Sequence, residues 1–380
     1  MPDCTTFTYT SARGWSVPEL PRLDSPQTLV VVFAASFFGY DPTPLVALRR
    51  AFPQAVMIGC SSAGEINGTH LQDDSIVVAV MRFARTRLLR ASAPIADAAG
   101  SFAAGTALGA ALADPELTGV FMLSVGLKVN GSDLVRGLTA ALPAGVVITG
   151  GLAGDGARFT TTWVLDGDQP RSAAAVAVGF AGPAVRIGHG SKGGWEGFGA
   201  ERVVTRSDAN VLYELDHQPA LALYKSWLGE RAAGLPATGL LFPLALREHP
   251  GAERQLVRTI LAVDEFRQSI TFAGDIPQGY HAQLMRANFD RLITGAADSG
   301  AMCAAGFPAA GPCLALAVSC IGRRLVLGER IEEELKAALK ALPPQTRQVG
   351  CYSYGEISPF AAGTCDLHNQ TMTLTLIYET

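Results

Sequence analysis

The sequence predicts a layered α/β fold with two domains, built from repeated units of strand, helix, strand, glycine-rich turn and strand. Three observations lead to this prediction. The chain has 380 residues, which is more than one hydrophobic core usually fills. Hydrophobic residues make up 48% and charged residues 17%, and 41 glycines are present, which excludes disorder and disfavours a simple helical bundle. The same order of elements also occurs three times, with short connections that favour some parallel strand pairing.

The first copy begins with a continuous apolar run over 29–36, which is typical of a buried strand. A helical stretch follows, with Leu45, Leu48 and Phe52 on one face. The remaining elements of this copy are the strand 55–58, the turn 59–66 and the strand 75–80. The turn has the sequence Gly-Cys-Ser-Ser-Ala-Gly-Glu-Ile, in which the glycines favour a sharp change of direction.

Two further copies follow the same order. The elements of the second are the strand 120–125, a helix with Leu134, Leu138 and Leu142 on one face and Ser132 or Asp133 as its N-cap, the strand 146–148, the turn 150–156 and the strand 174–178. The elements of the third are the strand 314–323, the helix 332–342, the turn 350–357 and the strand 371–377. The turns 59–66 and 350–357 share Gly-Cys and then Gly-Glu-Ile at the same spacing, which indicates a true repeat.

The segment between the second and third copies does not follow the repeat. Its first part, 186–195, is rich in glycine and polar residues and is predicted to be a loop. Its other predicted elements are the strands 203–205 and 211–215, a helix over 220–228 opened by Pro219 and stopped by Gly229, and a linker at 231–236. We therefore expect an N-terminal domain over 1–215 and a C-terminal domain over 216–380.

Charge and hydropathy exclude several classes of function. The net charge is −4 and no cluster of Lys or Arg exceeds a pair, so we expect no binding to nucleic acid. The longest apolar stretch, 313–321, is about half of the roughly 20 residues that a membrane helix needs, so we expect no membrane insertion. The N-terminus has no signal-peptide pattern, and the seven cysteines show no metal-binding spacing. These features are typical of a reduced, cytoplasmic protein.

Several motifs together resemble a known family. The matching residues are 59–65, 150–155, Trp195 with Gly199, 211–215, 219–221 with Tyr224, 319–323, 354–357 and 368–371. On these residues the chain resembles the FIST family of bacterial sensory proteins, which pair an N-terminal and a C-terminal FIST domain, over nearly the whole chain from about Leu29. At Asp216-His217 the family usually has Asp-Gly, so a histidine stands here where a turn suits glycine.

The resemblance implies a function in signal transduction. The family is thought to detect small ligands and to pass the signal to kinases, cyclases or chemotaxis receptors. The loop with His189, Lys192 and Trp195 is similar to that of NosP, a stand-alone branch that binds haem and reports nitric oxide to a histidine kinase. In this interpretation His189 is an axial ligand of haem, Lys192 meets a propionate and Trp195 packs on the macrocycle. The alternative is that His189 is a surface or hydrogen-bonded loop histidine that binds no ligand.

The glycine-rich turns supply four further candidate ligand-binding residues. Glu65, Asp155 and Glu356 occupy corresponding turns, where carboxylates suit a ligand with an amine or amide, although the glycines alone account for the turns. Arg323 follows a buried strand, and ligands of open α/β sheets bind beyond such strand ends. We expect Arg323 and Glu356 to lie near one cleft, either paired with each other or bridged by a ligand.

Two hypotheses follow. The first is a non-catalytic, cytoplasmic sensor of a small molecule, with haem as one candidate, which acts through a separate partner such as a histidine kinase, because no output domain is evident. The second is an enzyme of the hydrolase or transferase kind that uses a cleft at the repeated turns. Cys60 and Cys351 are its candidate nucleophiles, but neither is followed by a histidine at a spacing that indicates a catalytic base.

Overall fold

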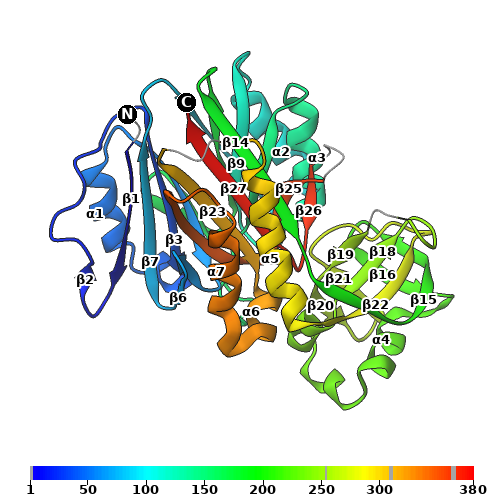
Figure 1. The fold of residues 1–380 in the computed structure, drawn as a ribbon. Helices are drawn as coiled ribbons and strands as arrows, with labels where there is room; N and C mark the ends of the chain where they lie inside the picture. The colour runs from blue at the N-terminus through cyan, green and yellow to red at the C-terminus, as the bar shows by residue number, and fades with distance from the viewer. Residues whose placement is uncertain (1–2, 253–254, 308–310, 361–364) are drawn as a thin grey trace.

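The computed structural model describes residues 3–252, 255–307, 311–360 and 365–380, and it confirms the mixed α/β class. Three sheets form a three-sided body, which we call the prism, and a fourth sheet forms a separate lobe over residues 195–287 (Figure 1). The lobe is inserted between the strand Val185–Lys192 and the helix Phe289–Ala304, ahead of the strand Cys313–Cys320 that opens the third repeat copy. Within the described residues, no helix is long and apolar enough to cross a membrane.

Each sheet of the prism is centred on the parallel pair of strands of one repeat unit. The strands of the first sheet, in spatial order, are β12 (Gln169–Arg171), β11 (Val164–Asp166), β4 (Val56–Ser62), β3 (Thr28–Ala35), β7 (Ser75–Arg82), β1 (Asp3–Thr10) and β2 (Gly14–Trp15). Those of the second are β26 (Cys365–His368), β25 (Gly355–Pro359), β10 (Val147–Leu152), β9 (Leu117–Ser124), β13 (Ala174–Ala181) and β8 (Arg87–Pro94). Those of the third are β14 (Val185–Lys192), β27 (Met372–Glu379), β23 (Cys313–Cys320), β24 (Thr346–Ser353), β5 (Glu65–Asn67) and β6 (His70–Gln72).

The three units exchange hairpins in a cycle. The hairpin β5–β6 of the first unit joins the third sheet, β11–β12 of the second joins the first sheet, and β25–β26 of the third joins the second sheet. Each glycine-rich turn therefore leads the chain from one sheet into its neighbour. This exchange binds the units to one another, because every sheet is completed only by strands from two units.

Apolar side chains fill the interior that the three sheets share. Buried members of this core come from all three central strands: Leu29, Val31 and Phe33 from β3, Phe121 and Leu123 from β9, and Leu314, Leu316 and Val318 from β23. Their alternation along each strand places the other apolar residues on the outer face, where helices cover them. The continuous apolar runs in the sequence thus reflect strands that are buried on both faces.

Helices cover the outer faces of the prism. They are α1 (Thr43–Ala51), α2 (Ser101–Ala111), α3 (Gly131–Ala141), α5 (Phe289–Ala304), α6 (Ile321–Leu327) and α7 (Ile331–Lys340). Figure 1 shows α1 outside the first sheet, α2 and α3 beside the second, and α5 and α7 across the third. Asn130 caps α3, because its side-chain oxygen accepts from the backbone N–H groups of Ser132 and Asp133.

The lobe has its own apolar core. Its strands are β19 (Leu256–Arg258), β18 (Leu244–Arg247), β22 (His281–Ala287), β15 (Trp195–Asp208), β16 (Val211–Leu215), β21 (Ser269–Phe272) and β20 (Ile260–Asp264), with β17 (Gln218–Pro219) paired to β16. The helix α4 (Ala220–Leu228) packs on this sheet with Leu221 and Tyr224 buried. Asp216 and His217 both adopt positive φ, at 49° and 60°, so the turn keeps a left-handed conformation although histidine replaces the usual glycine.

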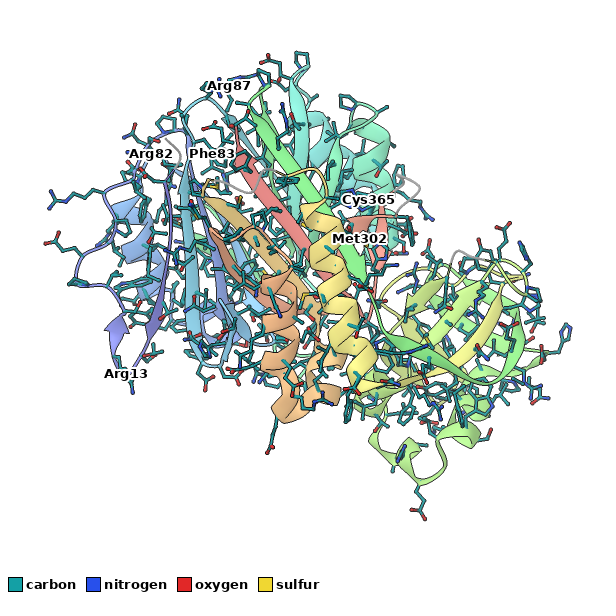
Figure 2. The ribbon with its side chains drawn as sticks, viewed as in Figure 1. Arg13, Arg82, Phe83, Arg87, Met302 and Cys365 are labelled. Atoms are coloured by element: carbon teal, nitrogen blue, oxygen red, sulfur yellow. The ribbon has the colours of Figure 1, made fainter. Side chains whose placement is uncertain are left out.

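The loop predicted over 186–195 is wrong. Residues Val185–Lys192 form β14, and β15 begins at Trp195, so only the short turn 193–194 remains irregular. The glycines in this segment allow a helix to approach: a Cβ on Gly188 or Gly190 would lie 2.1 or 2.0 Å from a backbone oxygen of α5. Figure 2 labels Met302 on this helix. Close packing of a strand against a helix, rather than mobility, explains these glycines.

Candidate functional site

A cleft of about 290 Å³ lies where the lobe meets the prism. Its walls come from the end of β14 and the start of β15, from β19 and β22 of the lobe, and from β26 and the turn before β27. The described residues that line it are Ser191, Lys192, Gly193, Gly194, Trp195, Gln255, Leu256, Val257, Met285, Phe360, Leu367, His368, Asn369 and Thr371. The structure thus brings two of the predicted ligand-binding residues, Lys192 and Trp195, to one cleft.

Trp195 gives this cleft an unsatisfied polar group. The side chain is only 8% exposed, and its indole N–H has no hydrogen-bond partner among the described residues. A Cβ added at Gly193, another residue of the cleft wall, would lie 3.8 Å from the Cδ1 atom that is bonded to that nitrogen. A buried donor normally has a partner, because leaving it unpaired costs about 1–3 kcal/mol. This N–H is therefore a candidate contact for a ligand.

Glu356 lies directly behind the cleft wall. One of its oxygens accepts hydrogen bonds from the Thr371 N–H and hydroxyl, at 3.1 and 3.0 Å, and the other accepts from the Ser353 hydroxyl at 2.6 Å. The Thr371 hydroxyl lies 3.1 Å from that of Thr373, which lies 2.8 Å from that of Ser191. Burial raises the pKa of Glu356 to about 8, so the side chain is mostly protonated at pH 7.

Glu65 repeats this arrangement in the first unit, away from the cleft. Its carboxylate accepts from the Ser75 N–H and hydroxyl at 3.1 and 2.9 Å, and burial raises its pKa to about 8. Glu65 pairs with Cys351 across the third sheet, as Glu356 pairs with Gly151 across the second. The expected equivalence of the two glutamates is confirmed. Each glutamate therefore links its exchanged hairpin by hydrogen bonds to the start of the last strand of its unit, at Ser75 for Glu65 and at Thr371 for Glu356.

Asp155 is not the third member of this set. By strand register the matching position is Val164, which pairs with Cys60 in the first sheet, because the segment before β11 is longer in the second unit. Asp155 accepts hydrogen bonds from the backbone N–H groups of 159–161 and from Tyr354. Burial alone would raise its pKa, but these hydrogen bonds lower it below the usual value. Asp155 thus holds the backbone of the segment between β10 and β11 in its conformation through these hydrogen bonds.

Arg323 pairs with Glu334 and not with Glu356. It lies in α6 just after β23, and its guanidinium is 3.1 Å from the Glu334 carboxylate, with both side chains fully buried. The guanidinium also donates to the carbonyl oxygens of Gly193, Leu292 and Gln370. Gly193 lies in the cleft wall and Gln370 lies between two residues of the wall, so the hydrogen bonds from Arg323 hold this part of the wall in place.

A second cavity of about 320 Å³ adjoins the cleft at Leu256. Cys365 lines it and lies on the edge of the prism toward the lobe (Figure 2). Arg258, which is 1% exposed, donates to the carbonyl oxygens of Asp275 and Leu367 at 2.9 and 3.0 Å, and Arg136 pairs with Asp275 at 2.7 Å. Sequence reasoning missed Arg258, because a single arginine in an ordinary strand carries no local signal.

His189 lies outside the cleft. It sits in the middle of β14 opposite Thr375 of β27, and it lines neither the cleft nor the second cavity. Burial lowers its pKa, so the imidazole is neutral at pH 7, and its Nδ1 has no partner among the described residues.

The two candidate nucleophiles are enclosed in the shared core. Cys60 and Cys351 are buried on neighbouring sheets, and the contact between their thiols together with burial raises the pKa of Cys351 well above its usual value. A protonated thiol without access to solvent is a poor nucleophile. Among the described residues, no group of three metal-binding side chains occurs either. Burial therefore makes Cys60 and Cys351 poor candidates for the nucleophile of the enzyme hypothesis.

Comparisons with known proteins agree with the sequence motifs. The family model of the FIST N domain matches residues 28–218, and that of the FIST C domain matches residues 220–359. No curated protein matches the chain in sequence. Among solved structures, a crystal structure of cyanuric acid hydrolase from A. caulinodans is similar with a TM-score of 0.37 and 10% identity, and the match covers 100% of this chain and 99% of that one.

Proposed function

The chain belongs to the FIST family, and from this premise we propose that it is a non-catalytic sensor whose small ligand binds in the cleft between lobe and prism. FIST domains are small-ligand sensory domains of signalling proteins. The observation that carries the proposal is the buried, unpartnered indole N–H of Trp195 in the wall of this cleft. A bound molecule that accepts this hydrogen bond removes the cost of leaving it unpaired.

Ligand binding produces a signal because the cleft lies between the lobe and the prism. Val257 and Met285 belong to the lobe, whereas Lys192 and Thr371 belong to the prism. A ligand that contacts both bodies stabilises one arrangement of lobe and prism over others, and it shifts their populations by its difference in affinity. The protein then acts in the cytoplasm on a separate signalling partner, such as a histidine kinase, which binds one arrangement more tightly.

A library of small molecules tests this proposal. We expect at least one compound among common organic acids, amino acids and nucleobases to raise the melting temperature by several degrees, since a ligand at 100 times its Kd stabilises by about 2.7 kcal/mol. Val257→Trp fills the cleft and should abolish this effect. Leu325→Trp, at an exposed site on α6, is the control and should retain it. If no compound stabilises the protein, or if Val257→Trp leaves the effect intact, the cleft is not the sensory site.

Haem with nitric oxide as the signal is the second candidate. The observation that favours it is the neutral imidazole of His189, whose Nδ1 is buried without a partner among the described residues. The expected result is a Soret band in haem-loaded protein that shifts when nitric oxide is added to the ferrous form. His189→Ala should weaken haem binding, whereas the exposed His249→Ala should not. Absence of haem uptake, or an unchanged spectrum in His189→Ala, would contradict this candidate.

A further inference from the structure

The polar groups of the cleft are unevenly engaged. Three of its acceptors already have partners: the carbonyl oxygen of Gly193 accepts from Arg323, the side-chain oxygen of Asn369 accepts from the Thr259 N–H, and that of Gln255 accepts from Arg247. Two of the donors are less engaged, whereas the Thr371 N–H and hydroxyl and the Asn369 amide already have acceptors. The Trp195 N–H has no partner among the described residues, and the Gln255 amide donates to the thioether sulfur of Met285 at 3.9 Å, which is a weak acceptor.

Within the described wall of the cleft, Lys192 is the charged side chain. It lies at the rim, where it also borders a shallow surface hollow next to α5 that Asp290 and Asp298 line, and it forms no ion pair with the described residues. No aspartate or glutamate occurs among the described residues of the wall. The carboxyl group behind the wall, Glu356, is mostly protonated at pH 7, because burial raises its pKa to about 8. Among the described residues of the wall, a ligand therefore meets a cation and two weakly engaged donors, and it meets no carboxylate that would accept an ammonium group.

The rest of the wall is apolar. Leu256 and Val257 of β19, Met285 of β22, Leu367 of β26 and Phe360 surround the polar groups. A volume of about 290 Å³ is at the small end of ligand sites and suits a molecule of roughly ten non-hydrogen atoms. The lining thus fits a compact apolar body that ends in a hydrogen-bond acceptor.

We propose that the ligand of this cleft is a small apolar carboxylate without an ammonium group, held by the Trp195 N–H and the Lys192 side chain. This inference rests on the proposed sensory function and adds the chemical class of the ligand. One carboxylate oxygen accepts from the buried indole, where hydrogen bonds to a charged group are strongest. An α-amino acid of the same shape is disfavoured, because its ammonium group loses its water and gains no carboxylate partner among the described residues of the wall.

Four compounds of nearly one size separate the possibilities in isothermal titration calorimetry. They are phenylacetate, phenylacetamide, phenylalanine and phenethylamine. We expect phenylacetate to bind tightest and the two compounds with an ammonium group to bind at least about tenfold more weakly. If phenylalanine or phenethylamine binds as tightly as phenylacetate, the cleft remains a ligand site and the sensory proposal survives, but the carboxylate class is wrong.

Two variants connect this preference to named atoms. Trp195→Phe keeps an aromatic ring but deletes the N–H together with the pyrrole part of the indole, and it should weaken phenylacetate binding about tenfold. Lys192→Gln should weaken the binding of phenylacetate and leave that of the neutral phenylacetamide unchanged. The matched controls Trp227→Phe, in the lobe, and Lys340→Gln, at the end of α7, should bind as the unmodified protein does.

The remaining outcomes are also decisive. Equal melting temperatures of the variants and the unmodified protein would show that a loss of binding is not a loss of folding. Unchanged affinity for phenylacetate in either Trp195→Phe or Lys192→Gln would overturn the assigned contacts. Failure of all four compounds to bind would overturn the ligand class, whereas the sensory function would still be decided by the broader library with Val257→Trp.

Discussion

Arg323→Ala is expected to lower the free energy of unfolding by about 3–5 kcal/mol, because it leaves the carboxylate of Glu334 buried without its cation. Both side chains are 0% exposed, and the guanidinium is 3.1 Å from the carboxylate. The hydroxyl groups of Ser319 and Tyr352 donate to the same carboxylate, at 2.8 and 3.4 Å, but neither carries a compensating charge. The loss also frees the carbonyl oxygens of Gly193 and Leu292, so ligand binding in the cleft should weaken as well.

Urea unfolding of three variants measures this effect. Arg330→Ala is the control, since Arg330 pairs with the exposed side chains of Asp290 and Glu333, and surface pairs contribute about 1 kcal/mol or less. The double variant Arg323→Met with Glu334→Leu removes both charges and should recover part of the stability that Arg323→Ala loses. A loss below about 1 kcal/mol in Arg323→Ala would mean that the buried pair does not support the fold in this way.

Gly150→Ala is expected to destabilise the protein by about 3 kcal/mol or more, because a Cβ at this position meets the backbone of the neighbouring strand. The added atom would lie 1.8 Å from the Met122 carbonyl oxygen, and backbone cannot move aside as a flexible side chain can. Gly150 also has a φ of 146°, which residues with a side chain rarely adopt. The position corresponds to Gly59 and Gly350, where a Cβ would lie 2.4 and 1.9 Å from a strand carbonyl oxygen.

Two other glycines separate the causes. At Gly145 φ is 89° but no atom lies within 4 Å of an added Cβ, so Gly145→Ala measures the cost of the backbone conformation alone, about 1 kcal/mol. Gly350→Ala measures the steric contact, since φ at Gly350 is not positive. Thermal unfolding should rank Gly150→Ala as the most damaging and Gly145→Ala as the least. A Gly150→Ala variant as stable as Gly145→Ala would contradict the close approach of β9 and β10.

Part of the candidate site was predictable from residues near one another in the chain. Lys192 and Trp195 are three positions apart, so any structure of this segment keeps them close, and the resemblance to FIST proteins singled them out. Their roles as ligand contacts stay predictions. The other walls come from β19, β22 and β26, which lie more than 60 residues further along the chain. Only the packing of the lobe against the prism brings these strands to Trp195, and short sequence motifs do not predict that packing.

The partners of charged residues were predicted less well. Arg323 and Glu356 were expected near one cleft, paired with each other or bridged by a ligand. Both lie behind the wall of the cleft, but Arg323 pairs with Glu334 of α7. Eleven positions separate Arg323 from Glu334 in the chain, across the end of α6 and the start of α7, and a charged residue on an amphipathic helix normally faces solvent. Glu334 faces inward because Arg323, Ser319 and Tyr352 surround it there. Such a partnership exists only after the helices have packed on the third sheet.

The sequence by itself determined the α/β class, the three repeat units, the equivalence of Glu65 and Glu356 and the family, because apolar periodicity, turn glycines and motif spacing are local properties. Only the tertiary structure decided the exchange of hairpins, the strand at 185–192 and the place of Val164 opposite Cys60. Strand pairing is a choice among edges that are distant in sequence and chemically alike, so it follows from packing and register. A glycine in the sequence does not by itself indicate which structure it belongs to, because both a turn and a close contact with a helix require a residue without a side chain. Only the position of the neighbouring helix distinguishes the two.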